Sequence, residues 1–135
     1  MALKRALRLR KSREFQRVRQ QGRSIASRLL ILAWTPNNEA STRVGFVVSK
    51  RVARHAVDRN AIKRLLGEAL RPALADLPAG WDIVISARQQ AADSDLRMLQ
   101  QDILTLLQRA QLLNGPGKGN QGRKGVPPIL PSPDS

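Results

Sequence analysis

The chain has 135 residues, which suits one domain with tails, and its 24 Lys and Arg against 10 Asp and Glu give a formal net charge of +14. A chain this basic requires a polyanionic partner; nucleic acid is the leading candidate and a membrane surface the second. The absence of cysteine excludes disulfides and thiolate metal sites and fits a cytoplasmic protein. One histidine, His55, and only two Phe and two Trp disfavour a histidine metal site, a catalytic triad or a base-stacking platform.

The first eleven residues predict a basic N-terminal arm, because closely spaced like charges resist packing. The same stretch could serve as an organelle transit peptide, since no acid precedes Glu14. Ser12 can cap a short helix over residues 13–20, which Gly22 then ends.

Three segments have the composition of strands. Residues 24–34 and 43–50 are rich in branched apolar side chains, and the turn-forming residues 35–42 lie between them. We therefore expect these two strands to pair in antiparallel fashion. A third strand is expected at residues 81–88, entered through Pro78 and Gly80.

Apolar periodicity predicts two further helices. The first begins at Asp58, a suitable N-cap, and ends near Arg71 because Pro72 follows. The second covers about residues 94–110, where Asp93 and Asp95 can cap its start. Helix, strands, helix, strand and helix over residues 12–113 predict one α+β domain with a mixed sheet. The Gly/Pro-rich residues 114–135 predict a disordered tail.

The helix that begins at Asp58 separates into two faces at ~100° per residue. Its leucines and isoleucine form an apolar face, and burying each such side chain is worth roughly 1.5–3 kcal/mol. The other face, with the end of the preceding strand, forms a candidate phosphate-binding surface of Lys50, Arg51, Arg54, Arg59, Asn60, Lys63, Arg64 and Arg71. An ordinary solvated helix face is the alternative. Gly67 either permits close approach of an RNA backbone or has no role.

A long motif in this region resembles the protein subunit of bacterial ribonuclease P. The motif is "RVGFVVSKRVARHAVDRNAIKRLLGEALR" at residues 43–71, and residues 9–24 and 82–88 resemble that family's first helix and a later strand. The resemblance covers about residues 4–110. It implies a single-domain α-β sandwich of about four strands and three helices with a left-handed β-α-β crossover. It also implies a role in removing the 5′ leader from precursor tRNA.

The resemblance carries over to individual residues. Lys50 and Arg51, and the helix residues Arg59, Asn60, Lys63 and Arg64, match positions that contact RNA in the family. The resemblance also implies a substrate-leader cleft, which we place at Phe15, Arg19, Ile31 and Ala33.

Four positions depart from the family pattern. Ala61 and Gly67 stand where the family has arginine, and Arg19 and Ala33 stand where it has aromatic residues. Trp34 follows Ala33, and strand alternation sends it to the opposite face. Arg19 could replace aromatic stacking through phosphate contact or guanidinium stacking.

The resemblance assigns the chemistry to an RNA partner. In that family the RNA subunit cleaves the precursor, so we expect this chain to be an accessory subunit of an endoribonuclease that supplies no catalytic residue. We expect Mg²⁺ to be held mainly by the RNA, and one protein copy per RNA. The expected partners are the ribonuclease P RNA subunit and precursor tRNA, with no membrane. A ribosomal-protein-like RNA binder and a DNA-binding helix module are the alternatives.

Overall fold

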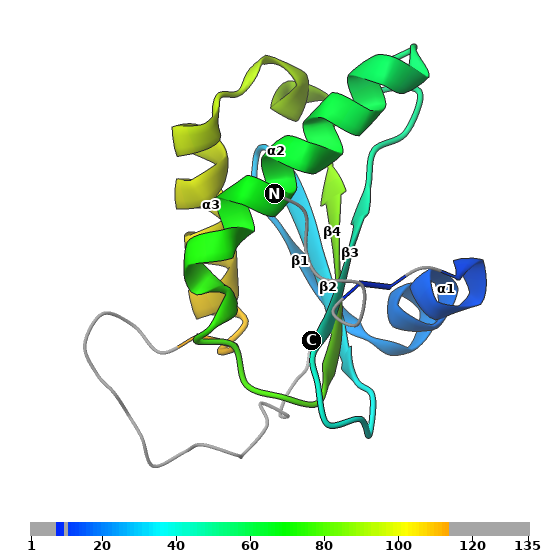
Figure 1. Cartoon of the computed structure of the whole chain (residues 1–135), viewed down its shortest axis with the longest axis vertical. Helices are drawn as coiled ribbons and strands as arrows, with labels where there is room; N and C mark the ends of the chain where they lie inside the picture. Colours follow the sequence, from blue (N-terminus) through cyan, green and yellow to red (C-terminus); the bar gives the residue numbers. More distant parts are fainter. Residues whose placement is uncertain (1–7, 10, 114–135) are drawn as a thin grey trace.

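The computed structural model describes residues 8–9 and 11–113 (Figure 1). In chain order, the helices and strands are α1 (Ser12–Gln21), β1 (Arg23–Ala26), β2 (Leu30–Pro36), β3 (Arg43–Val47), α2 (Ala56–Leu74), β4 (Trp81–Ala87), the 3₁₀ helix η2 (Gln89–Asp93) and α3 (Leu96–Arg109). The predicted tail and most of the predicted basic arm lie outside the described residues. The expected α+β architecture of four strands and three α-helices is confirmed.

The strands form one mixed sheet in the order β1-β2-β4-β3. β2 pairs antiparallel with both β1 and β4, and β3 pairs parallel with β4. The prediction that residues 24–34 pair with residues 43–50 is therefore wrong. Residues 24–34 contain two strands, and their turn has neither Gly nor Pro. Instead, the Ser27 hydroxyl accepts hydrogen bonds from the backbone N–H groups of Leu29 and Leu30.

The helix α2 connects the parallel neighbours β3 and β4, as the predicted β-α-β unit requires. In Figure 1 both strands run upward, and α2 crosses in front of the sheet from β3 on the right to β4 on its left. This path is a left-handed crossover, as the family resemblance implies and against the general right-handed rule.

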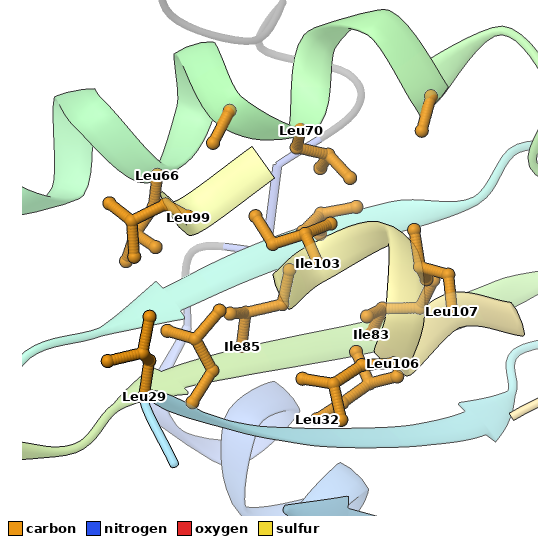
Figure 2. Packing of buried hydrophobic residues seen from close by; sticks show 14 of the residues in the cluster. Leu29, Leu32, Leu66, Leu70, Ile83, Ile85, Leu99, Ile103, Leu106 and Leu107 are labelled. Atoms are coloured by element: carbon orange, nitrogen blue, oxygen red, sulfur yellow. The ribbon is translucent and has the colours of Figure 1, made fainter. Parts of the chain in front are cut away.

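One face of the sheet carries the larger hydrophobic core. Strand alternation turns Leu32, Ile83 and Ile85 toward this face, where α2 and α3 cover them (Figure 2). The helices contribute Leu66, Leu70, Leu99, Ile103, Leu106 and Leu107. The apolar face predicted for α2 is thus buried, and it fixes the opposite face of the helix toward solvent.

The other face of the sheet is covered in part by α1, which lies across from α2 and α3 in Figure 1. Val18 packs on Ala33 and Val84 in a second, smaller core. The Phe15 ring occupies the space where Gly45 has no side chain, because a Cβ at Gly45 would lie 2.4 Å from Phe15 Cε2. Leu9 is buried in the same core, and its N–H donates to the Val44 carbonyl at 3.0 Å.

The ends of α2 differ from those predicted. The helix begins at Ala56 after His55, so Asp58 lies in its first turn and is not the N-cap. It also continues through Pro72 to Leu74. Pro72 is exposed, and the buried Ala73 beyond it packs in the core and holds the last turn in place.

In α3 the predicted cap is confirmed, because Asp95 accepts a hydrogen bond from the Met98 N–H at 2.9 Å.

Candidate RNA-binding surface

The segment between β3 and α2 is a turn rather than the end of a strand. β3 ends at Val47, and the Val52 N–H donates to the Ser49 carbonyl at 3.0 Å. Lys50, Arg51 and Arg54 are all exposed on this segment. The three cations predicted at a strand end therefore belong to a turn, which we call the 48–55 loop.

Arg59 differs from the other basic residues because its side chain is half-buried and held by the fold. Its Nη1 donates to the carbonyls of Ala53 at 3.1 Å and Arg54 at 2.8 Å. These contacts join the first full turn of α2 to the 48–55 loop. Arg59 thus positions the loop cations, with the rest of its guanidinium left to contact a ligand.

The solvent side of α2 carries Asn60, Lys63 and Arg64, all exposed. Across the described part of the chain, the side chains of Lys63 and Arg64 make no hydrogen bond or ion pair. Arg71 lies about 18 Å along the helix from Arg59 at 1.5 Å per residue, and it pairs with Glu68 at 3.1 Å. Within α2 and the 48–55 loop, the unpaired cations therefore lie toward the start of the helix, on what we call the basic surface: Lys50, Arg51, Arg54, Lys63 and Arg64, with the polar Asn60 among them.

Gly67 does not belong to this surface. It is buried, and a Cβ added there would meet only Phe46 Cε2, at an ordinary contact distance of 3.9 Å. Phe46 projects from β3 toward α2 on the side of the larger core. The helix therefore has room for a methyl group at this position.

On the opposite side of the molecule, part of the sheet is left open beside α1. The register places Ile31 opposite Ser86, and Ser86 opposite Val47, so these three side chains form a row on the α1 face. Ile31 is exposed and the other two are half-buried. We call this row the sheet strip; sequence reasoning found Ile31, whereas Val47 and Ser86 emerge only from the strand register.

The other predicted leader residues lie on the same face as the sheet strip. Phe15 is half-buried against Gly45, Arg19 is exposed on α1, and Ala33 is only 7% exposed beneath α1. Trp34 is buried in the larger core, which confirms that it faces away from Ala33. Any aromatic contact from this face would therefore come from Phe15.

A buried ionic cluster fixes α1 on the sheet, and sequence reasoning missed it. Asp82 on β4 is fully buried and accepts hydrogen bonds from Arg43 Nε at 2.9 Å and Nη2 at 2.8 Å, from Arg17 Nη2 at 2.5 Å and from Asn37 Nδ2 at 2.8 Å. Arg43 also contacts Glu14 at 3.3 Å. The available signal was a single acid inside the apolar strand "WDIVISA".

The cluster keeps Asp82 ionised. Burial of the carboxylate would by itself raise its pKa, but the hydrogen bonds from Arg43, Asn37 and Arg17 and the charge of Arg43 outweigh burial and hold the pKa below its ordinary value. The hydrogen bond to Asp82 likewise raises the pKa of Arg43. Arg17 and Glu14 lie roughly 140–200° around α1 from Arg19, so the cluster directs Arg19 away from the Asp82 end of the sheet.

The described residues also bear on membranes and metals. None of the helices in residues 8–9 and 11–113 has both the length and the apolar composition of a membrane span. Within the same ranges, no three His, Asp or Glu side chains come close enough together to hold a metal ion.

A cationic loop and helix on one side of a small sheet, with an open strip on the other, define a basic protein of the α+β class with a candidate surface for a polyanion. The match to known proteins then gives the family. Residues 3–111 match the family described as Ribonuclease P, and the chain belongs to the family of ribonuclease P protein components.

Relatives agree in sequence and in structure. The Ribonuclease P protein component of Chloroflexus aurantiacus is 44% identical over 115 residues, 84% of each chain, and that of Roseiflexus castenholzii is 41% identical over 84% of this chain and 93% of the relative. The RNase P protein of Staphylococcus aureus superposes with a TM-score of 0.73 at 32% identity, covering 82% of this chain and all of the other. The RNase P protein of Thermotoga maritima superposes with a TM-score of 0.68 at 28% identity, covering 76% of this chain and 96% of the other.

Proposed function

We propose that the chain binds the RNA subunit of ribonuclease P through the basic surface. The observation that carries this proposal is that Lys63 and Arg64 are exposed and unpaired within the described residues, beside a loop whose three cations Arg59 holds in place. Such a group of cations neutralises several phosphates and releases their counterions. Arg71 is expected to contribute less, because Glu68 already pairs with it.

We further propose that the sheet strip, with Phe15 and Arg19, receives the single-stranded 5′ leader of precursor tRNA. The strip offers apolar surface from Ile31 and Val47 and a hydroxyl from Ser86, and the exposed Arg19 adds a cation on α1, which covers part of the same face. The side chain of Ala33 adds little contact area because α1 covers it. Backbone contact with the leader is expected to dominate over base stacking.

The protein acts as an accessory subunit in this proposal, and the RNA supplies the catalytic groups. Mg²⁺ is assigned mainly to RNA oxygens, and when bound it stabilises the attacking and leaving oxygens. The assignment is supported by acids that already have partners: Asp82 binds two arginines and an amide, Asp95 caps α3, and Asp102 accepts from Ser27. We propose one protein per RNA subunit and a cytoplasmic location.

Replacing free cations of the basic surface tests the proposal. Lys63→Ala with Arg64→Ala should weaken binding of the RNA subunit at 0.1 M salt by roughly 25-fold, because each single-strand phosphate contact adds about 0.7 to the salt exponent. The slope of log Kd against log salt should fall by about 1.4 in a filter-binding titration. Arg109→Ala, which removes an exposed arginine near the end of α3, is the control and should leave both values unchanged.

Two outcomes would contradict this function. If the double variant binds the RNA subunit as tightly as the unaltered chain, the basic surface is not the binding site. If the unaltered chain binds ribosomal RNA or duplex DNA as tightly as the ribonuclease P RNA under the same salt conditions, the family-specific role fails.

A further inference from the structure

A second candidate site lies on the side of the sheet away from the strip, between the β1–β2 turn and α3. Its hollow has a volume of about 370 Å³ and is lined by Arg28, Leu29, Arg97, Met98, Gln101 and Asp102. Because α3 covers the larger core, this hollow opens on the face opposite α1. It is therefore separate from the proposed leader site.

The wall formed by the β1–β2 turn is held by several hydrogen bonds. The Ser27 hydroxyl, which also caps its own turn, donates to the Asp102 carboxylate of α3. Arg88 holds the turn from the other side, since its Nη1 donates to the Ser27 carbonyl at 2.7 Å and its N–H to the Leu29 carbonyl at 2.8 Å. The turn and α3 thus form a pre-organised pair of walls.

The lining combines the groups that an unstacked nucleotide requires. Arg28 and Arg97 are exposed, and across the described residues their side chains have no hydrogen-bond or ion-pair partner, so both can contact phosphate. Met98, which is 40% exposed, gives an apolar surface for a base. The Gln101 amide and the Asp102 carboxylate can accept hydrogen bonds from the exocyclic amino group of a base.

The β1–β2 turn that forms one wall of the hollow is also linked to the 48–55 loop of the basic surface. Arg88 and Gln89 are adjacent in the chain: Arg88 contacts the β1–β2 turn, and Gln89 Nε2 donates to the Arg51 carbonyl of the 48–55 loop at 3.3 Å. The β1–β2 turn, the residues that begin η2 and the cationic loop therefore lie side by side. An RNA strand bound along the loop would have its next phosphates near Arg28.

We propose that this hollow binds one unstacked nucleotide of RNA, with its base on Met98 and its phosphates on Arg28 and Arg97. The proposal rests on the proposed function and extends it, because it adds a contact outside the basic surface. Asp102 and Gln101 favour a base with an amino group over uracil. The nucleotide belongs either to the RNA subunit or to precursor tRNA.

Photocrosslinking can locate this nucleotide, because the chain has no cysteine and a single one can be labelled uniquely. Met98→Cys carrying an azidophenacyl group is assembled with the RNA subunit and precursor tRNA, each radiolabelled in turn. A crosslink to one labelled RNA is expected, and its identity gives the source of the nucleotide. Leu104→Cys is the matched control, because Leu104 is 38% exposed on the same helix but does not line the hollow.

Affinity measurements supply an independent test. Arg28→Ala and Arg97→Ala should each weaken binding of the crosslinked RNA about fivefold at 0.1 M salt, and Arg109→Ala should have no effect. Equal crosslinking from positions 98 and 104, or crosslinking of position 98 to a second protein copy, would overturn the proposal. So would unchanged affinity in both arginine variants. If the unaltered chain itself does not bind the RNA subunit, the proposed function is contradicted instead.

Discussion

Arg59 is the basic residue of α2 whose guanidinium the fold already uses. Replacing it with alanine removes two hydrogen bonds to loop carbonyls, each worth about 0.5–1.5 kcal/mol. We expect Arg59→Ala to increase amide hydrogen exchange across residues 50–55 and to weaken RNA binding. Arg64→Ala should weaken binding without changing exchange. Unchanged exchange in Arg59→Ala would show that Arg59 does not position the loop.

Gly67 gives a test that separates helix stability from RNA contact. Glycine in a helix costs roughly 0.5–1 kcal/mol relative to alanine, and a methyl group at this position meets nothing closer than 3.9 Å. Gly67→Ala should therefore raise the free energy of unfolding by about that amount and leave RNA affinity unchanged. Thermal or urea denaturation measures the first effect and filter binding the second.

Gly45 is the matched control for that substitution. A methyl group there would lie 2.4 Å from the Phe15 ring, and such overpacking typically costs about 1–3 kcal/mol. Gly45→Ala should thus destabilise the fold. If both variants change stability in the same direction, the packing described for these two glycines is wrong.

At the scale of elements, the Asp82 cluster joins α1 to the sheet. Because the folded state holds the pKa of Asp82 below its unfolded value of about 4, its stabilising contribution is fully present above that value. The contribution is lost as the pH falls through the folded-state pKa. Stability should therefore decrease on acidification below about pH 4 and should not depend on this group near neutrality.

Asp82→Asn tests the cluster directly. The substitution removes the carboxylate charge that faces Arg43 and Arg17. Because both arginines are partly exposed and Arg43 keeps Glu14 as a partner, we expect a loss of about 1–3 kcal/mol. Urea unfolding at pH 7 should show this loss, and the difference from the unaltered chain should shrink as the pH falls below 4. A constant difference between pH 7 and pH 3 would contradict the role assigned to the Asp82 charge.

The elements also show what the sequence could and could not predict. Apolar periodicity correctly gave α2 and α3, because a helix held by one apolar face repeats that pattern along the chain. The strand partners were not predicted, because pairing depends on contacts between distant residues. The β1–β2 turn was missed because a serine side chain, rather than Gly or Pro, stabilises it.

For the whole molecule, the family motif placed the candidate RNA-binding residues on one side, where all but the half-buried Arg59 are exposed. The sequence did not distinguish cations that are free, such as Lys63, from those that the fold uses, such as Arg59 and Arg71. That distinction depends on side-chain partners from other turns. The sheet strip likewise required the register, since Ile31, Ser86 and Val47 come from three strands.

The proposed role in leader removal is tested most directly by measuring cleavage of precursor tRNA by the reconstituted RNA subunit at low Mg²⁺, with and without the protein. Adding the protein is expected to increase leader removal, because its cations supply charge neutralisation that Mg²⁺ would otherwise provide. Lys63→Ala with Arg64→Ala should lose most of this increase, whereas Arg109→Ala should retain it. If the unaltered protein does not improve processing, or if the double variant improves it equally well, the basic surface does not have the proposed role.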